Sequence, residues 1–313
     1  MTYGNGQYTY ELVDGWAKLP GEWTFKDVCS VTTDAQDRVY LLNRGEHPVA
    51  VFDREGNFLY SWGEDLFARA HGSGMGRDGS IYCTDDILHV VYKFTLEGKL
   101  LQTLGNKRQP SDTGYAADHT DFFWSLTTIA RGAPPFNRPT GVAVAGSGVI
   151  YVSDGYGNAR VHKFSPEGEL LLSWGEPGYE PGHFRLPHDI WVDRQERVWV
   201  PDRENSRIQV FSAQGEFLAQ WEDFIRPTDL FIDEEGTVYV CELCERVSIF
   251  NSDGQLLARW GNGAGKDMAK TLFIAPHTIA VDSRGDVYVG EVSYTGNGID
   301  RGARTVQKFA RKT

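Results

Sequence analysis

The amino-acid sequence predicts an all-β fold, a six-bladed β-propeller that forms one domain over residues 1–313. Three observations favour this prediction. A similar unit recurs along the chain at intervals near the 40 to 50 or so residues of a four-stranded propeller blade. Apolar and polar residues alternate inside each unit with the period of two that strands show when one face is buried. The composition, with 35 glycines, 9 tryptophans and 14 tyrosines, favours turns and strands.

The recurring unit has a fixed order of side chains. It begins with proline and then histidine or threonine, passes through an apolar alternation to aspartate and a glycine turn, and continues as Val-Tyr-Val, Val-x-x-Phe and Gly-x-Leu-Leu-x-x-Trp-Gly. The phenylalanine that ends the third strand occurs six times, at Phe52, Phe94, Phe164, Phe211, Phe250 and Phe309. Six copies predict six blades, and the pattern is typical of NHL repeats.

Two features depart from an even series of units. The sixth unit ends at Phe309 without a fourth strand, while an unmatched strand, YTYELVDGWAKL, lies near the N-terminus. We expect this segment to complete the last blade and close the ring, which removes an open sheet edge. Insertions at 106–137 and 293–304 lengthen two of the intervals. Long loops often carry function, so each insertion is either a cover over a substrate site or a plain surface excursion.

Charge and composition exclude several classes of partner. The formal net charge of -12 would repel a phosphate backbone, and no cluster of lysine and arginine stands out against it. No apolar stretch of about 20 residues is present, and the N-terminal residues are too polar for a secretory signal. We expect no nucleic-acid partner, no membrane segment and a cytoplasmic location, and the oligomeric state stays open.

The four cysteines, Cys29, Cys83, Cys241 and Cys244, are too few and too scattered for a disulfide framework in a chain of this length. We interpret them as reduced thiols. Cys241 and Cys244 form a CxxC motif, but no second CxxC or βαβ pattern accompanies it, and it lies in a predicted strand.

One position of the repeat carries a chemical signal. Alignment of the six units on their Val-Tyr pairs gives one equivalent position at the start of the innermost strand, here called the slot, which is occupied by Cys29, His71, Thr140, His188, Thr228 and His277. Histidine fills the slot in alternate units, and alternate blades of a six-bladed ring lie about 120° apart. Three imidazoles that point at the axis would form the trigonal set of a catalytic zinc site, with the fourth position left for water or substrate.

We therefore predict that His71, His188 and His277 bind one metal ion. The fold itself does not require histidine, since threonine and cysteine fill the slot in the other units, and the remaining histidines of the chain lie elsewhere in the repeat. Imidazole ligands without a carboxylate or thiolate favour zinc over copper or iron, although nickel and cobalt accept the same ligands. Cys29 could add a sulfur ligand, but this would break the trigonal symmetry.

Several motifs together resemble the peptidyl-α-hydroxyglycine α-amidating lyases, zinc-dependent NHL propellers, along nearly the whole chain. The matching segments are NRGEH, HGSGMGRDGSIYCTDD, PTGVAV with VSDGYGNARV, LPHDIWVDRQERVWVPDRENSRIQVF and APHTIAVDSRGDVYVGE. Many binding proteins share single repeats of this kind, whereas the three histidines together with DGY and DRENSR are more specific. The resemblance implies a lyase that breaks the C–N bond of an N-acyl hemiaminal, an α-hydroxyglycine amide, to give an amide and glyoxylate.

The resemblance also implies roles for single residues. The three slot histidines match the zinc ligands of the family, Tyr156 matches its catalytic tyrosine, and Arg44 and Arg203 match arginines of its active site. In such a site zinc would lower the pKa of the substrate hydroxyl and Tyr156 would take its proton. Arg44 or Arg203 would hold the substrate carboxylate with a guanidinium fork. Asp202 and Asn205 are interpreted as residues that stabilise a turn.

The sequence departs from the family at Thr278, which stands where the family has an aspartate that also binds a structural calcium. Calcium is therefore a weaker expectation than zinc, and the substrate, a small molecule or a peptide-derived compound, stays open. Two alternative functions remain. One is a metal-dependent hydrolase of a lactone, ester or amide, although propeller lactonases tend to hold calcium with carboxylates. The other is a non-catalytic NHL propeller that binds proteins, which leaves the three histidines unexplained.

Overall fold

The computed structural model describes residues 2–261 and 271–312. In these residues the strands form six sheets, five with four strands and one with five, as the predicted six-bladed β-propeller requires. The third strand of every sheet contains the predicted buried phenylalanine. The chain divides into two compact units, residues 67–227 and residues 1–66 with 228–313, each holding three sheets. That residues 1–313 form one domain stays a prediction.

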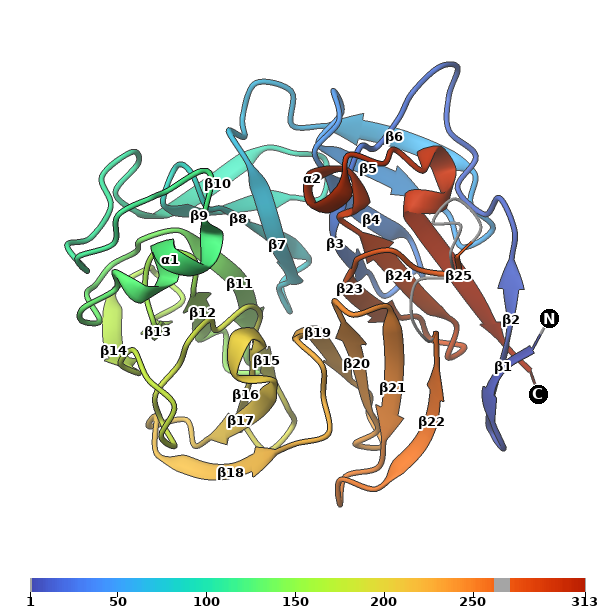
Figure 1. The fold of residues 1–313 in the computed structure, drawn as a ribbon. Coiled ribbons are helices and arrows are strands. Elements are labelled where there is room, and N and C mark those ends of the chain that lie inside the picture. The colour runs from blue at the N-terminus through green and yellow to red at the C-terminus, as the bar shows by residue number, and fades with distance from the viewer. Residues whose placement is uncertain (1, 262–270, 313) are drawn as a thin grey trace. The chain divides into compact units, whose positions relative to one another are not determined.

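The unit of residues 67–227 contains three four-stranded sheets (Figure 1). The first consists of β7 (Ala70–Met75), β8 (Ser80–Asp85), β9 (Val90–Thr95) and β10 (Leu100–Gly105). The second consists of β11 (Pro139–Val144), β12 (Ile150–Asp154), β13 (Arg160–Phe164) and β14 (Leu170–Trp174). The third consists of β15 (Trp191–Val192), β16 (Val198–Asp202), β17 (Arg207–Phe211) and β18 (Phe217–Trp221), with the short 3-10 helix η1 (Arg203–Asn205) between β16 and β17.

The other unit contains two four-stranded sheets and one five-stranded sheet. The first consists of β3 (Val28–Thr33), β4 (Val39–Asn43), β5 (Val49–Phe52) and β6 (Phe58–Trp62). The second consists of β19 (Pro227–Ile232), β20 (Val238–Glu242), β21 (Arg246–Phe250) and β22 (Leu256–Trp260). The third consists of β23 (Pro276–Val281), β24 (Val287–Glu291), β25 (Val306–Arg311), β2 (Tyr8–Val13) and β1 (Thr2–Asn5).

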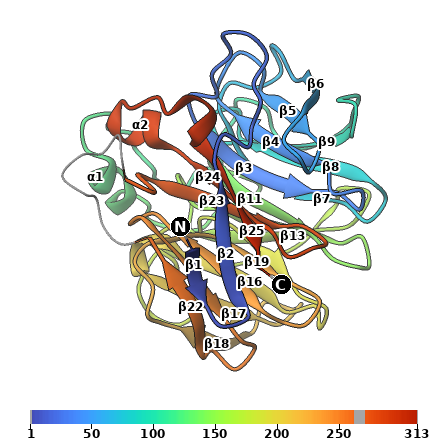
Figure 2. The ribbon, with the colours of Figure 1, turned by 90° about the vertical axis from the view of Figure 1, so that its right-hand side faces the viewer.

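The five-stranded sheet confirms that an N-terminal strand completes the last blade. β2 pairs with β25, with Leu12 opposite Phe309, and supplies the fourth strand that the sixth repeat lacks. β1 then pairs with the outer edge of β2, and Figure 2 shows these two strands side by side. The sheet therefore contains both ends of the described chain.

In four of the six repeats, the aspartate that ends the apolar alternation fixes the first hairpin of the sheet. Asp193 Oδ1 accepts hydrogen bonds from the backbone N–H groups of Gln195 and Arg197, both at 2.9 Å. Asp34 and Asp282 make the same pair of bonds in the other unit. Such a side chain copies a backbone turn, so the short turn and the strand register follow from this one residue.

A buried polar side chain at the end of the second strand holds the loop that leads into the first strand of the same sheet. Asp202 Oδ1 accepts from the N–H of Arg185 at 2.9 Å, and Asn205 donates to the other oxygen of Asp202 at 2.7 Å. Asp85 accepts from the N–H of Arg69 at 3.1 Å in the corresponding loop. These bonds agree with the turn-stabilising interpretation of Asp202 and Asn205, and they fix the backbone just before the slots.

The two insertions contain the α-helices of the described chain. Residues 106–137 include α1 (Phe122–Thr127), and residues 293–304 include α2 (Ser293–Asn297) and part of the 3-10 helix η2 (Gly302–Thr305). Asp121 caps α1 by accepting a hydrogen bond from the backbone N–H of Trp124. Within the described residues, no helix is long and apolar enough to cross a membrane.

Candidate metal centre

Four of the six slot residues lie at β-bulges, namely Cys29, His71, Thr140 and His277. In β23, Pro276 and Thr278 both pair with residues of β24, while His277 between them has no residue opposite. The ladder skips His71 in β7 in the same way, and it skips the slot residues of β3 and β11. A bulge turns a side chain away from the regular alternation of the strand. The slot therefore owes its geometry to a repeated irregularity in addition to its place at the start of the strand.

His188 corrects one detail of the sequence prediction, because it precedes β15 and does not begin it. Its backbone N–H donates to Pro201 O at 2.8 Å, but regular pairing starts only three residues later. The backbone N–H of Ile190 donates to the carboxylate of Asp189 at 2.7 Å and is therefore not available for pairing with β16. Pro201 in β16 has no N–H that could donate to the segment before β15. The innermost strand of this sheet is consequently reduced to two residues.

The ring nitrogens of two slot histidines have defined roles. His71 Nδ1 lies 2.7 Å from the carbonyl oxygen of Thr140, and His277 Nδ1 lies 2.8 Å from that of Cys29. Each acceptor is the slot residue of another sheet in the same unit. A carbonyl only accepts, so Nδ1 carries the proton and Nε2 keeps its lone pair. Metal-binding histidines are oriented by this kind of contact, which leaves Nε2 as the ligand atom.

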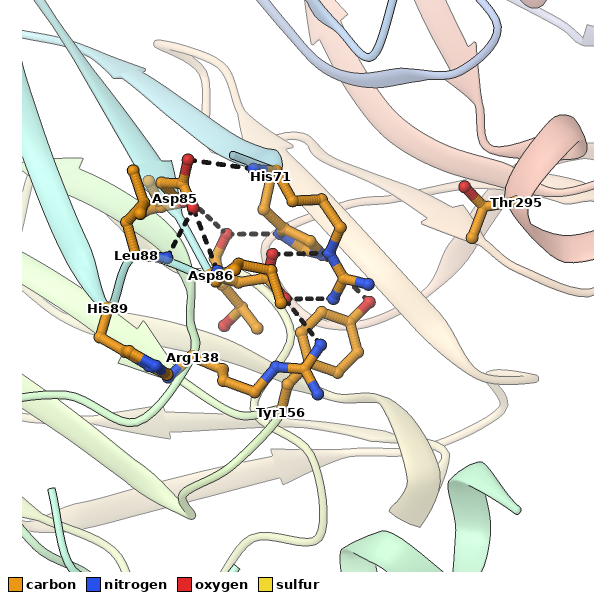
Figure 3. A network of polar contacts seen from close by, with 12 residues as sticks. His71, Asp85, Asp86, Leu88, His89, Arg138, Tyr156 and Thr295 are labelled. Carbon is orange, nitrogen blue, oxygen red and sulfur yellow. Dashed lines mark hydrogen bonds and ion pairs between the residues drawn. The ribbon is translucent and has the colours of Figure 1, made fainter. Parts of the chain in front are cut away.

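Tyr156 meets two of the slot histidines within the unit of residues 67–227. Its phenolic oxygen lies 3.0 Å from His71 Nε2 and 3.2 Å from His188 Nε2, and the two imidazole centroids are 4.9 Å apart. Figure 3 shows the His71 ring and the Tyr156 phenol next to each other. All three side chains are buried. Imidazole nitrogens are ligands that zinc accepts, so the Nε2 atoms of these two histidines fit the metal implied by the family.

Arg203, from η1, lies beside the same phenolic oxygen. Its Nη1 is 3.4 Å from the Tyr156 oxygen, and its Nε forms an ion pair with Glu204 at 2.8 Å. Burial works against the charged form of Arg203, but Tyr156 and Glu204 outweigh it, so the pKa of Arg203 is raised. The guanidinium therefore stays charged next to Tyr156.

Two more arginines stack on the ring of Tyr156, and the sequence reasoning missed both. The guanidinium carbons of Arg69 and Arg138 lie 5.6 and 5.3 Å from the ring centroid. Asp86, which is fully buried, binds Arg69 Nε at 2.7 Å and Arg138 Nη2 at 3.0 Å. Burial lowers the pKa of Arg69, but the attraction of Asp86 is stronger, so the pKa is raised overall. Figure 3 shows Asp86 and Arg138 reaching toward each other beside Tyr156.

A signal for these arginines was present in the repeat. Arg69 stands two residues before the slot residue His71, and Arg138 stands two residues before the slot residue Thr140. Arg226 precedes its slot by the same distance. An alignment that compared this position as well as the slot would have singled out the three.

The insertion of residues 106–137 packs against this group. The ring of Phe122 in α1 lies 6.0 Å from that of Tyr156, and the Tyr115 hydroxyl accepts a hydrogen bond from Arg138 Nη1 at 2.7 Å. Leu126 and the Tyr156 ring belong to one apolar cluster. The insertion thus covers Tyr156 inside its own unit, which favours a functional role over a plain surface excursion.

Arg44 and His277 belong to the other unit. Arg44 Nη1 contacts Asp27 at 3.3 Å and Thr295 Oγ1 at 3.1 Å, so it lies against the second insertion. Thr278 donates to Asp229 at 2.8 Å. Of the six predicted site residues, the structure brings four together within residues 67–227: His71, Tyr156, His188 and Arg203.

The cysteines show no sign of metal or redox chemistry. None of the four forms a disulfide within the described part of the chain, and Cys29 Sγ donates to the carbonyl oxygen of Leu42 at 3.2 Å, as a thiol does. Burial raises the pKa of Cys241 well above its ordinary value, which disfavours the thiolate that a zinc site needs. The geometry therefore agrees with reduced structural thiols.

Comparison with known proteins supports the same family. The model of the NHL repeat matches residues 136–164 and 184–211. NHL repeat-containing protein 3 of Homo sapiens is 30% identical over 322 residues, which cover 96% of this chain and 84% of that protein. Peptidyl-alpha-hydroxyglycine alpha-amidating lyase 1 of Drosophila melanogaster is 31% identical over 189 residues, 56% of this chain and 31% of that protein.

The matches to amidating enzymes are partial, since the chain spans about a third of their length. A solved streptogramin B lyase structure shares the fold with a TM-score of 0.60 at 14% identity, covering 97% of this chain and 88% of that one. Identity this low supports the fold alone. The repeat match, the relative matched over most of its length and the amidating lyase together give one result: this chain belongs to the NHL-repeat propeller family and is similar to the peptidyl-α-hydroxyglycine α-amidating lyases.

Proposed function

We propose that this chain is a zinc-dependent carbon–nitrogen lyase that cleaves an N-acyl hemiaminal into an amide and glyoxylate or a related carbonyl compound. The observation that supports it most directly is the position of the Tyr156 oxygen, 3.0 and 3.2 Å from the Nε2 atoms of His71 and His188. A proton acceptor and two metal-ligand nitrogens then meet where a substrate hydroxyl would have to lie. The name of the Drosophila melanogaster relative supports the type of reaction.

The proposed metal ligands are His71, His188 and His277, three buried histidines that could hold a metal ion. His277 is included because it fills the same slot as His71 and donates Nδ1–H to a slot carbonyl in the same manner. Zinc bound there would supply Lewis acidity that makes a substrate hydroxyl easier to deprotonate.

Tyr156 is the proposed base. Its oxygen accepts the proton of the hemiaminal hydroxyl; the hydroxyl oxygen then forms a carbonyl with the same carbon, and the C–N bond breaks. The electrons of that bond leave on the nitrogen, which takes the proton from Tyr156 and becomes the amide, so the tyrosine returns to its starting ionised form. Arg203, with Nη1 3.4 Å from the phenolic oxygen, stabilises negative charge there.

Arg44 and Arg203 are the proposed partners of the substrate carboxylate, because a guanidinium fork matches its two oxygens. Arg203 contacts Tyr156 directly. Arg44 belongs to the other unit. We also propose a small-molecule or peptide-derived substrate and a cytoplasmic location.

Glyoxylate release from N-acetyl-α-hydroxyglycine, measured beside the metal content, tests the proposal. We expect close to one zinc per chain in protein prepared without chelator. Tyr156→Phe should lower kcat by about 10² to 10⁴, the range for loss of a general base, and should leave the zinc bound. Unchanged turnover in Tyr156→Phe would refute the proposed base.

The alternative functions give different results in the same experiment. Bound metal without glyoxylate release, together with cleavage of a lactone or ester, would indicate a hydrolase. Less than about half an equivalent of bound metal would rule out both the lyase and the hydrolase, because each requires a metal ion held by the three histidines. It would favour a binding propeller, a role compatible with the match to NHL repeat-containing protein 3.

A further inference from the structure

Asp86 and the two arginines that it binds form a group with a net positive charge. One buried carboxylate binds two guanidinium groups, those of Arg69 and Arg138, so the group has one positive charge in excess. Asp85 is the next acid in the chain, but its oxygens accept hydrogen bonds from backbone N–H groups and not from either guanidinium. A buried excess of charge is costly unless a counterion joins it.

The donors of these arginines are only partly used. Arg69 donates hydrogen bonds from Nε and Nη2 to Asp86. Among the described residues, none accepts a hydrogen bond from Arg69 Nη1. Arg138 gives Nη1 to Tyr115 and Nη2 to Asp86, while its Nε is buried and has no hydrogen-bond partner among the described residues. A buried N–H without a partner costs stability, so such a group points to a ligand or a bound water.

The group is both accessible and preorganised. The Arg69 side chain is 31% exposed, whereas Asp86 is completely buried and fixes two of the guanidinium donors. Tyr115 and the Tyr156 ring hold Arg138 from two further directions. Fixed guanidinium groups of this kind bind a carboxylate with paired, charge-assisted hydrogen bonds.

We propose that Arg69 and Arg138, held by Asp86, form a subsite for a second carboxylate of the substrate. This inference rests on the proposed lyase function, in which Arg203 or Arg44 holds the carboxylate next to the reacting carbon. Glyoxylate has only that one carboxylate, so the second belongs to the acyl part. Arg69 and Arg138 lie against the ring of the same tyrosine whose oxygen takes the proton, so the acyl chain is short. The preferred substrate is a hemiaminal with a short dicarboxylic acyl group.

Two substrates that differ only in this carboxylate test the subsite: N-succinyl-α-hydroxyglycine and N-acetyl-α-hydroxyglycine. The wild-type protein should have a kcat/KM at least about tenfold higher for the succinyl compound, mainly through KM, as one charge-assisted contact provides. Arg69→Gln and Arg138→Gln should each reduce this ratio to about one to two, whatever their effect on turnover of the acetyl compound, because the ratio compares two substrates of the same variant.

Arg131→Gln is the matched control, because this arginine lies in the insertion of residues 106–137, is 54% exposed and pairs with Asp112. It removes the same charge without touching Tyr156, so the succinyl preference should persist. Equal kcat/KM for both substrates in the wild type overturns the subsite, as does a preference that survives in both Arg69→Gln and Arg138→Gln. Arg69→Gln carries the test if Arg138→Gln does not fold, because Arg69 is the more exposed.

Failure of the lyase function would be recognised separately, as absence of glyoxylate from both substrates. Calorimetry on chelator-treated protein then tests the subsite with succinate and butyrate, which differ in one carboxylate. Succinate should bind the wild type at least about tenfold more tightly than butyrate, and Arg69→Gln should abolish the difference. Equal binding of the two to the wild type overturns the subsite.

Discussion

β7 and β23 carry histidine at the same slot, but the side chains around the two histidines differ. Both histidines are buried, and both donate Nδ1–H to a slot carbonyl, at 2.7 Å from His71 and 2.8 Å from His277. Within its own unit His71 also meets Tyr156. The strand of His277 continues with Thr278, which donates to Asp229. The repeat therefore sets the orientation of these histidines, and the loops and neighbouring side chains set their surroundings.

The largest expected effect is the loss of zinc and of activity when any one of the three slot histidines is replaced. His71→Ala, His188→Ala and His277→Ala should each reduce bound zinc to below about half an equivalent and abolish glyoxylate release, since three ligands hold the proposed ion. His162→Gln is the control, a buried histidine outside the slot that contacts Ser173 at 2.8 Å, and it should keep the zinc. Full metal content in His277→Ala alone would confine the metal site to residues 67–227.

Arginines of the two units provide the next comparison. Arg203→Gln should lower kcat by about 10 to 100-fold, because the lost guanidinium faces the proton-accepting oxygen. Arg44→Gln should raise KM by a similar factor with kcat nearly unchanged, if its role is to hold the substrate carboxylate. Steady-state kinetics separate the two parameters. An unchanged KM in Arg44→Gln would make this arginine a support for Asp27 and the second insertion.

The repeat pattern was sufficient to predict the fold. The six phenylalanines, the turn aspartates and the unmatched N-terminal strand each correspond to one structural feature, because period-two alternation and turn chemistry act over a few neighbouring residues. The grouping of His71 and His188 with Tyr156 and Arg203 follows partly from the slot and partly from the family motifs. Both kinds of signal lie in short sequence segments, so they could be recognised without the structure.

The features that sequence reasoning missed depend on irregular side-chain contacts, several of them between residues far apart in the sequence. The shortening of β15 results from a side chain that takes a backbone donor and from a proline on the next strand. Asp86 binds Arg138, which lies 52 positions away, and no periodicity encodes such a pair. The packing of α1 on Tyr156 likewise joins two residues that no sequence pattern relates. Repeats predict what recurs, whereas a site gains its chemistry from what does not recur.

A smaller effect is expected from the glycine that follows His71. A Cβ atom at Gly72 would lie 2.3 Å from the carbonyl oxygen of Thr140, the acceptor for His71 Nδ1. Gly72→Ala should displace this acceptor and weaken zinc binding by about 10 to 100-fold, the usual cost of losing an outer contact of a ligand. Gly146→Ala, which meets no atom within 4 Å, is the control. Zinc affinity from chelator competition should separate the two; equal affinities would mean that the Thr140 contact does not orient His71.

The smallest effect compares single acids of the two units. Burial raises the pKa of Asp229 from its ordinary 3.8 to about 7, so the folded protein holds this proton more tightly than the unfolded chain. Stability is then lost as the pH rises from about 4 to 7, and the full cost persists above 7. Asp229→Asn should raise Tm at pH 8 and change it little at pH 4.

Asp78 provides the opposite sign, because its hydrogen bond to Lys93 lowers its pKa to about 2. Its contribution is present above about pH 4 and is lost as the pH falls toward 2, and it is small because the side chain is 57% exposed. Asp78→Asn should therefore lower Tm slightly at pH 8, where Asp229→Asn raises it. Thermal unfolding at the two pH values measures both, and a lower Tm for Asp229→Asn at pH 8 would mean that the hydrogen bonds from Thr278 and Ile279 stabilise the carboxylate more than burial destabilises it.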